Sequence, residues 1–479
     1  MLSEVSEVAV STSAEPRPDL RIGADPPEGP AARDAPAEIL ARQRRRESAA
    51  RTYARHLPIV PVRAEGMTVT GADGRRYLDC LSGAGSLALG HNHPVVVAAI
   101  RRVLDSGAPL HVLDLATPIK DEFTETLFGA LPPDLARTGR IQFCGPTGAD
   151  AVEAALKLVR TATENTGLIA FTGAYHGMTA GALAATGANA VRDPVRVNDA
   201  GVTRMPFPQD YRCPYGVGGP DGARVAISHL RRLLDDPHSG MTAPAGLIVE
   251  PVQGEGGVHP APDAWLRAVR DLTAEHRIPL IADEVQTGLG RTGELWGVDH
   301  AGVTPDVMVL SKAVGGGLPL AVIVYRAELD RWAEGAHAGT FRGNQLAMAA
   351  GTATIKYVLE HGLAARAGIA GARMLDALRG CRARIPAVGD VRGRGLMIGV
   401  ELVDPDAGPD ELGARPAAPA LARAVRAEAL ERGLLVELGG RHGAVVRLLP
   451  PLTIRDGTAD QVVSTLIEAL AAATGVRRP

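Results

Sequence analysis

The stretch IADEVQTGLGRTGELWGVDHAGVTPDVMVLSKAVGGG, residues 281–317, brings together two short apolar runs that each end in a charged residue. The run PLIA is followed by Asp283, and the run DVMVLS is followed by Lys312. Apolar runs of this length with polar or glycine-rich ends are typical of buried strands in a parallel sheet. Ligands of open α/β sheets bind beyond the carboxyl ends of the strands, so we expect Asp283 and Lys312 to face one site.

Lys312 is the lysine best placed for chemistry. Its amine can react with carbonyl groups, and desolvation in a crevice would lower its pKa. The glycines at 315–317 would let a ligand approach the backbone closely. The other three lysines, Lys120, Lys157 and Lys356, fall in helical patterns, where solvated helix faces are expected. Placement therefore favours a catalytic Lys312 over a structural surface lysine.

Asp283 supplies an acidic group at the end of the neighbouring strand. Pyridoxal phosphate is held by a lysine together with a charged partner at its ring nitrogen, which Asp283 could provide. Taken alone, the dipeptide Asp283-Glu284 would more often cap a turn. Its combination with Lys312 favours the functional interpretation.

The segments DEVQTGLGRTG (283–293) and SKAVGGGLP (311–319) together resemble the class III pyridoxal-phosphate aminotransferases of the ornithine, acetylornithine and GABA type. The resemblance covers roughly residues 54–472. It implies the fold type I architecture, an α/β large domain with a mostly parallel sheet plus a smaller α+β carboxyl-terminal domain. It also implies pyridoxal 5'-phosphate as cofactor, Lys312 and Asp283 as catalytic residues, and a homodimer or higher homo-oligomer with sites at the interface.

The composition excludes several other classes of protein. Of 479 residues, 46% are hydrophobic, which is enough for a large core, and 51 basic against 54 acidic residues give a net charge of −3 without a basic field for nucleic acid. The chain lacks an apolar run of 18 residues, so we expect no membrane span. Four separated cysteines without a CxxC pair favour reduced thiols, no metal site and a cytoplasmic protein.

The chain order suggests four parts. Residues 1–36, rich in Pro, Ala and acidic residues, predict a disordered tail, and residues 37–95 an N-terminal segment. Within it, residues 37–56 have a helix-forming composition, and MTVTGADGRRYLDC (67–80) predicts a hairpin around its Asp-Gly pair. Residues 96–345 would form the large domain, in which residues 193–222 are expected to be a loop. Residues 346–479 would form the small domain.

A phosphate cradle is expected at Thr147, Gly148 and Ala149, between the run IQFC and a helical pattern. Free amides at a helix start, with the positive end of the helix dipole, bind anions. By itself a glycine-containing turn is more often an ordinary loop, and the family resemblance favours the phosphate interpretation. The family motif is usually Ser-Gly-Ser/Thr, so here one hydroxyl is missing and backbone amides carry more of the contact.

Further site residues follow two other expected strands. Tyr175 and His176 follow LIAF; the residues alone suggest a half-buried aromatic and a satisfied histidine, whereas the resemblance implies that Tyr175 stacks on the cofactor ring. In AGLIVEPVQGEGGV (245–258), the glycines do not open a helix, which excludes a dinucleotide fingerprint. The resemblance implies that Glu250 and Gln286 contribute to the cofactor site and that Glu255 faces the substrate.

Two residues later in the chain complete the predicted site. The resemblance implies that Thr340 reaches the cofactor phosphate of the neighbouring subunit, although a helix cap is a compatible alternative. Arg447 precedes LLPPL and resembles the arginine that binds the substrate carboxylate, as a planar guanidinium can do through two hydrogen bonds. Strand-edge arginines are otherwise usually solvated.

The expected activity is transfer of a terminal amine to 2-oxoglutarate. The segments LDCLSGAG (78–85) and GHNHP (90–94) most resemble the branch of the family that uses L-2,4-diaminobutyrate as donor, giving aspartate 4-semialdehyde and glutamate reversibly. Ornithine, acetylornithine and GABA are alternative donors, and an aminomutase or racemase could use the same lysine. A cofactor-binding regulator is disfavoured because no helix-turn-helix or basic arm accompanies the core.

Overall fold

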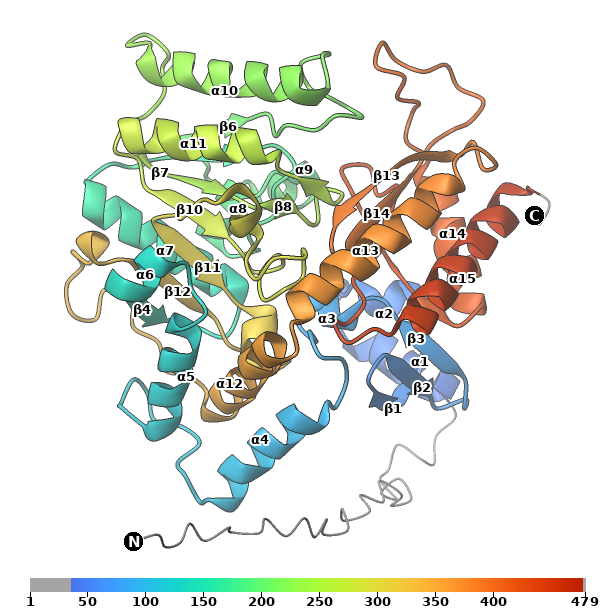
Figure 1. Ribbon diagram of the computed structural model, residues 1–479, viewed down its shortest axis with the longest axis horizontal. Helices are drawn as coiled ribbons and strands as arrows, with labels where there is room; N and C mark the ends of the chain where they lie inside the picture. The colour runs from blue at the N-terminus through green and yellow to red at the C-terminus, as the bar shows by residue number, and fades with distance from the viewer. Residues whose placement is uncertain (1–35, 477–479) are drawn as a thin grey trace, which may run out of the picture. The chain divides into compact units, whose positions relative to one another are not determined.

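The computed structural model describes residues 36–476, which form two compact units, one up to Val60 and the other from Pro61 onward (Figure 1). The first contains α1 (Pro36–Arg46) and α2 (Tyr53–His56). The helix-forming composition of residues 37–56 thus corresponds to two helices with a break between them. The break follows Arg46, and the Ser48 hydroxyl accepts a hydrogen bond from the Ala50 amide, a local bond that competes with helix continuation. The predicted disordered tail lies outside the described residues, apart from Pro36.

The second unit is organised around a seven-stranded sheet. Its order is β4 (Gly139–Phe143), β12 (Val322–Arg326), β11 (Val307–Leu310), β10 (Leu280–Asp283), β7 (Pro244–Val249), β5 (Gly167–Phe171) and β6 (Val202–Met205). β12 alone runs antiparallel to its neighbours, so the expected mostly parallel sheet is confirmed. The loop expected over residues 193–222 is wrong in part, because it contains β6.

Helices cover both faces of this sheet, which is why its central strands are apolar throughout. One face packs on α7 (Gly148–Thr163), through residues such as Val152 and Leu156 at helical spacing. The opposite face contributes Leu247 and Leu280 to a core shared with α11 (Asp263–Glu275). In Figure 1, α10 (Gly219–Asp235) lies beyond α11 on that side. Residues on both faces of β10 and β11 are buried.

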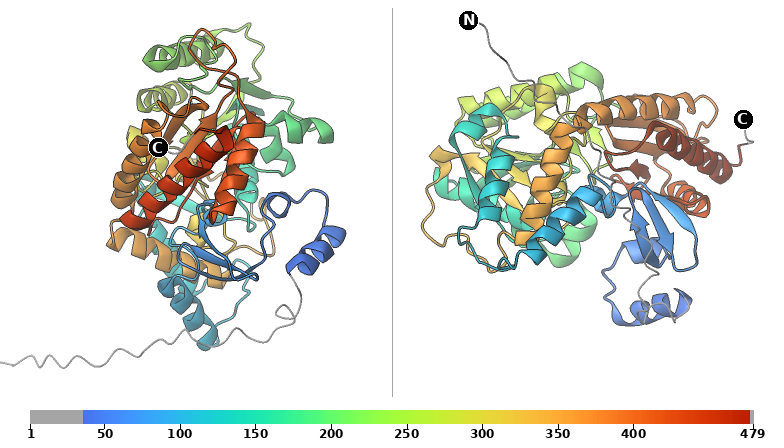
Figure 2. Two further views of the ribbon diagram at one scale, coloured as in Figure 1. Left: turned by 90° about the vertical axis from the view of Figure 1, so that its right-hand side faces the viewer. Right: turned by 60° about the horizontal axis from the view of Figure 1, so that its bottom comes forward.

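The carboxyl-terminal part forms an antiparallel sheet covered by helices, as the expected α+β domain requires. The strand order is β13 (Val388–Arg394), β14 (Met397–Leu402), β17 (Val445–Leu448) and β16 (Glu437–Gly439). The helices are α13 (Leu363–Gly380), α14 (Pro419–Glu431) and α15 (Asp456–Thr474). Figure 2 shows α14 and α15 side by side along this part of the chain.

The predicted hairpin is confirmed as β2 (Thr68–Gly71) and β3 (Arg76–Asp79). It joins β1 (Pro61–Glu65) and, by parallel pairing, β15 (Leu434–Leu435), so a segment near the start of the chain shares a sheet with one near its end. Four helices lie between β3 and β4 in the sequence: α3 (Ser82–Gly85), α4 (Pro94–Asp105), α5 (Pro118–Phe128) and α6 (Pro133–Thr138). Of these, α4 and α5 pack against α12 (Gln345–Glu360). Within residues 36–476, every helix is too short or too polar to span a bilayer.

Candidate active site

The structure brings Asp283 and Lys312 to the same edge of the central sheet. Asp283 is the last residue of β10. Lys312 lies two residues after the end of β11, the parallel neighbour of β10. Lys312 has a φ of 50°, a left-handed conformation that residues with a Cβ rarely adopt. Such conformations persist only where the surroundings hold them, and they cluster at functional sites. The sequence expectation that both residues face one site is therefore supported by the register of two adjacent strands.

The amine of Lys312 lies in the field of four charged side chains. Burial lowers its pKa below the ordinary value, and the positive charge of Arg447 acts in the same direction. The carboxylates of Glu255, Asp283 and Glu250 offset only part of this shift. A lowered pKa makes the neutral amine more available near neutral pH, which suits a lysine that attacks a carbonyl or moves a proton.

Asp283 is held by His176, which the sequence alone suggests is only a satisfied histidine. Nδ1 of His176 lies 2.7 Å from Oδ2 of Asp283, and the amide of Val285 donates to Oδ1 at 3.1 Å. Burial by itself lowers the pKa of His176, but the hydrogen bond to Asp283 and nearby negative charge raise it above the ordinary value. The pair fixes the Asp283 carboxylate in one orientation inside the protein.

Glu250 connects two of the loops that carry predicted site residues. Its carboxylate accepts the backbone amides of Tyr175 at 2.9 Å and Gly254 at 3.0 Å. Burial raises the pKa of Glu250 to about 7, although those amides favour its charged form. Tyr175 keeps 38% of its surface exposed, so its ring is accessible to a ligand. The contacts of Glu250 thus position the Tyr175 loop, whereas its own contact with a cofactor stays a prediction.

The predicted phosphate cradle lies at the first turn of α7. Thr147 caps the helix: its hydroxyl oxygen accepts the Asp150 amide, while Asp150 Oδ2 accepts the Thr147 amide at 3.2 Å. The amides of Gly148 and Ala149 belong to the first turn, where an α-helix has no intrahelical acceptor for them. A Cβ at Gly148 would meet the Val285 side chain at 3.0 Å, so glycine permits close packing against the loop after β10.

Gln286 and Thr340 have different surroundings. Nε2 of Gln286 donates to the Ala84 carbonyl at 3.4 Å, and a Cβ at Gly254 would lie 1.9 Å from Gln286 Oε1, so this side chain bridges segments next to the site. Thr340 is exposed in the segment before α12. Within residues 36–476, no hydrogen bond joins it to the other predicted site residues, and its predicted role concerns a second subunit.

Arg447 is fully buried between two carboxylates. Its Nη2 lies 2.8 Å from Glu255 Oε1 and 2.7 Å from Glu437 Oε2. β17 runs between β14 and β16, so the alternative of a solvated strand-edge arginine is wrong. Sequence reasoning missed Glu437. The only signal was the pattern of a short strand before β17, and this did not predict which residue would lie opposite Arg447.

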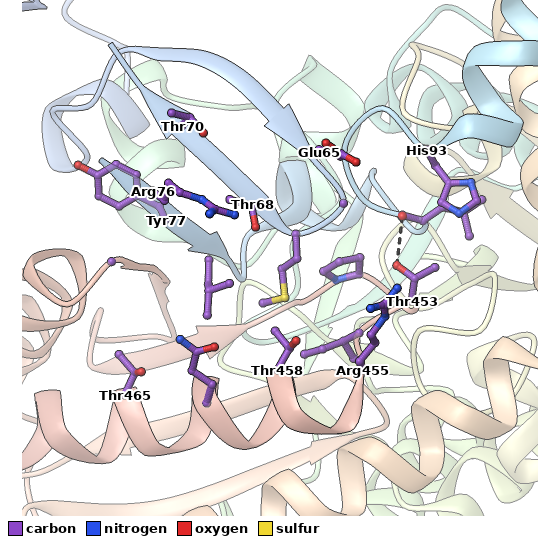
Figure 3. Close-up of a pocket in the computed structure, with 18 of the residues that line it drawn as sticks. Glu65, Thr68, Thr70, Arg76, Tyr77, His93, Thr453, Arg455, Thr458 and Thr465 are labelled. Carbon is purple, nitrogen blue, oxygen red and sulfur yellow. Dashed lines mark hydrogen bonds between the residues drawn. The ribbon is translucent and has the colours of Figure 1, made fainter. Parts of the chain in front are cut away.

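A separate cavity of about 1260 Å³ lies between β1–β3 and α15 (Figure 3). The close-up shows Thr68, Thr70 and Arg76 on the sheet side, facing Thr458 and Thr465 of α15. None of the predicted site residues lines it. It is a surface cavity of mixed polar and apolar lining, distinct from the edge of the central sheet.

The residues at the sheet edge fit the cofactor that the resemblance implies. A helix start can hold a phosphate, a buried carboxylate can face a protonated ring nitrogen, an accessible tyrosine can stack on a ring, and a lysine of lowered pKa can react with an aldehyde. Each comes from a different segment of the central sheet. Such a sheet and such an edge define the fold type I pyridoxal-phosphate enzymes.

The comparisons with known proteins identify the family. Residues 49–470 match the model of the class-III aminotransferases, so the chain belongs to this family of pyridoxal-phosphate-dependent aminotransferases. A diaminobutyrate–2-oxoglutarate aminotransferase of Rhizobium meliloti is 53% identical over 430 residues, 90% of this chain and 92% of the relative. One of Haemophilus influenzae is 46% identical over 440 residues, 92% of this chain and 96% of the relative.

Solved structures agree with this assignment. An amine transaminase from an uncultivated Pseudomonas species, in its PLP-bound form, superposes with a TM-score of 0.79 at 30% identity, covering 90% of this chain and 97% of the other. An (S)-enantioselective ω-transaminase from Thermomicrobium roseum gives 0.81 at 28% identity, covering 92% and 99%. The fold expected from the sequence is therefore confirmed.

Proposed function

We propose that this protein transfers the terminal amine of L-2,4-diaminobutyrate to 2-oxoglutarate, giving aspartate 4-semialdehyde and glutamate, in a reversible reaction. The observation that carries this proposal is the 53% identity, over nine-tenths of the chain, to a protein named for that reaction. The Glu255–Arg447 pair next to Lys312 supports it, because only one of the two half-reactions brings a carboxylate on the reacting carbon to Arg447.

When bound, pyridoxal phosphate supplies an aldehyde that accepts the amine and a ring that withdraws electrons from the reacting carbon. The amides of Gly148 and Ala149, with Thr147, hold its phosphate, and Tyr175 stacks on its ring. Asp283 keeps the ring nitrogen protonated, and His176 keeps that carboxylate oriented. Gln286 and Glu250 complete the cofactor site, Glu250 chiefly by holding the Tyr175 loop.

Lys312 carries the chemistry of the protein itself. Its lowered pKa lets the amine act as a base that takes the proton from the reacting carbon of the substrate. The same amine would then pass this proton to the cofactor. The negative charges of Glu255 and Asp283 act against that shift and favour the protonated form, so the amine can both accept and release the proton. Substitution of Lys312 by alanine should therefore abolish turnover.

Glu255 and Arg447 accommodate two kinds of substrate. The terminal carbon of diaminobutyrate carries no carboxylate, so during the first half-reaction Glu255 remains paired with Arg447. Glutamate and 2-oxoglutarate carry a carboxylate on the reacting carbon, and this group takes the place of Glu255 on the guanidinium.

The assembly we propose is a cytoplasmic homodimer or higher homo-oligomer. Thr340 is exposed in the chain, as a residue that reaches the cofactor phosphate of a neighbouring subunit must be. The family resemblance supports this role, and the subunit-mixing experiment described in the Discussion tests it.

The proposal is tested with a panel of donors. The purified enzyme is incubated with 2-oxoglutarate and either diaminobutyrate, ornithine, acetylornithine or GABA, and both products are identified by mass spectrometry. We expect diaminobutyrate to give the highest kcat/KM, with one glutamate formed per aspartate semialdehyde. A higher value for another donor would reassign the substrate. Conversion of donor without glutamate would favour an aminomutase or racemase. Lys312→Ala is the background control.

A further inference from the structure

The two carboxylates on Arg447 contact the same nitrogen. Nη2 lies 2.8 and 3.0 Å from the two oxygens of Glu255, and 2.7 Å from Oε2 of Glu437. Arg447 is fully buried and Glu437 nearly so, so their contact is not a weak surface ion pair screened by water, whereas Glu255 is partly exposed. A single partner would suffice to neutralise the charge of the guanidinium. The second carboxylate therefore needs an explanation.

The two partners differ in how freely they can move. Glu437 lies on β16 directly opposite Arg447 in the antiparallel register of β17, and 14% of its side chain is exposed. Glu255 lies in a turn between Gly254 and Gly256, and 35% of its side chain is exposed. The Glu255 carbonyl accepts the Gly440 amide at 2.9 Å, which anchors its backbone. Movement is therefore easiest for the Glu255 side chain, while Glu437 stays in place.

Without Glu437, displacement of Glu255 would remove the carboxylate that compensates the buried charge of Arg447. An uncompensated buried charge is strongly unfavourable, so the arginine would hold Glu255 tightly and resist the exchange. We propose that Glu437 is the fixed counter-ion of Arg447, which keeps the guanidinium neutralised and in position while Glu255 moves away and a substrate carboxylate arrives. Glu437 is a positioning residue in this scheme. The inference rests on the proposed exchange of Glu255 for the carboxylate of 2-oxoglutarate.

The surroundings of Glu437 support this assignment. The charge of Glu437 also affects Arg426 of α14, but within residues 36–476 no ion pair under 4.0 Å joins those two. Arg447 is therefore the cation with which Glu437 forms its ion pair.

The proposal predicts opposite effects of one substitution in two backgrounds. In the otherwise unchanged enzyme, Glu437→Gln makes the open state costly, so the second-order rate constant of the 2-oxoglutarate half-reaction should fall by roughly tenfold or more. The diaminobutyrate half-reaction keeps Glu255 on Arg447 and should change little. In a Glu255→Ala background, Glu437→Gln removes the second of these two carboxylates, so an added dicarboxylate compensates more of the guanidinium charge and should bind on the order of tenfold more tightly.

The experiment uses holoenzyme and glutarate, a dicarboxylate that cannot react. Glutarate affinity is measured by the shift in melting temperature and by titration of the cofactor absorbance, for Glu255→Ala with and without Glu437→Gln. Single-turnover rates of both half-reactions are measured for Glu437→Gln and for Glu437→Asp, which keeps the charge and should recover most of the loss. Glu401→Gln is the matched control, because Glu401 is a buried carboxylate of the same sheet that pairs with Arg212 and Arg392 instead.

The outcomes separate this inference from the function on which it rests. Arg447→Ala should abolish the binding of glutarate. If glutarate still binds, Arg447 is not the carboxylate site, and both the exchange of Glu255 at Arg447 and the counter-ion role of Glu437 are overturned. If Arg447→Ala abolishes it but Glu437→Gln leaves glutarate affinity unchanged in the Glu255→Ala background, the counter-ion role alone is overturned. Equal losses in both half-reactions for Glu437→Gln and Glu401→Gln would show a structural role and also overturn it.

Discussion

Nδ1 of His176 and Oδ2 of Asp283 lie 2.7 Å apart, although the two residues are 107 positions apart in the sequence. The side chain of His176 is fully buried and that of Asp283 nearly so. A buried carboxylate keeps its charge only when partners compensate for the lost water. The charge that Asp283 presents to the cofactor site therefore depends on the histidine behind it.

Replacement of His176 by phenylalanine should lower kcat by on the order of 10- to 100-fold, as loss of a residue that orients a functional group does elsewhere. Phenylalanine cannot hydrogen-bond Asp283, so the carboxylate loses the contact that fixes its orientation. Asp283→Asn should lose roughly a hundredfold or more, since its side chain carries no negative charge.

The kcat values of both variants, each compared with its melting temperature, decide between a positioning role and a merely structural one. His91→Phe is the matched control, because His91 forms a similar 2.8 Å pair with Asp79 at another place in the chain. It should reduce stability without a comparable loss of kcat. An unchanged kcat for His176→Phe would contradict the assigned role.

The stability of the protein should fall as the pH rises between about 4.5 and 7, in part because of Glu284. Its carboxylate accepts the amides of Gly297 and Val298, yet burial raises its pKa to about 7 from an ordinary value of 4.5. The folded state then holds a proton that the unfolded state has released. The stabilisation from this group is complete below pH 4.5 and is lost as the pH passes 7.

Urea unfolding of Glu284→Gln across this range tests the prediction, since glutamine has no proton to exchange. We expect a shallower decline in the free energy of unfolding than in the parent protein. The decline should not disappear, because the pKa of Glu250 is raised to about 7 in the same way. An identical slope in both proteins would show that Glu284 titrates normally in the folded state.

The sequence predicted the parts of the site that depend on local pattern. Asp283 and Lys312 follow apolar runs, and the rule that parallel strands present their carboxyl ends together was sufficient to bring them to one edge. His176 and Glu437 were not predicted in their observed roles, because their partners are set by which strands become neighbours. That order depends on the packing of the whole sheet.

Local pattern also failed where tertiary pairing decides the conformation. The strand β6 has the sequence VTRM, which gives no clear alternation, and it exists because β5 pairs with it along its length. The broken helix over residues 37–56 illustrates the opposite case, since its composition favours a helix but Ser48 forms a bond of its own. Composition gives the tendency, and specific hydrogen bonds set the ends.

Subunit mixing should reveal a shared site if Thr340 contributes to a neighbouring subunit. Lys312→Ala and Thr340→Ala homodimers should each be impaired. In a heterodimer of the two, one site carries both substitutions and the other carries neither, so activity should rise above that of both parents. Activity that never exceeds the better parent, after subunit exchange has been verified by mass spectrometry of differently tagged chains, would place Thr340 outside the shared site.

The pair of Glu255 and Arg447 should make the two half-reactions separable. With Glu255 in place, the guanidinium is already occupied, and this favours a donor whose reacting carbon carries no carboxylate. Glu255→Ala should therefore weaken discrimination against glutamate-like donors while it changes the 2-oxoglutarate step little. Arg447→Ala should reduce the 2-oxoglutarate step by on the order of a hundredfold or more, because the carboxylate loses a charge-assisted partner in a buried place.

Single-turnover measurements of each half-reaction, with diaminobutyrate and then with 2-oxoglutarate, distinguish these effects from a general loss of structure. Removal of Glu255 leaves Arg447 paired with Glu437 and open to the substrate, whereas removal of Arg447 leaves two carboxylates, Glu255 and Glu437, facing each other. Arg447→Ala should therefore also slow the diaminobutyrate step somewhat, since Glu437 repels the Glu255 side chain into the space that the substrate occupies. If both variants lose activity equally in both half-reactions, the exchange at Arg447 does not control substrate choice, and the selectivity must arise elsewhere in the pocket.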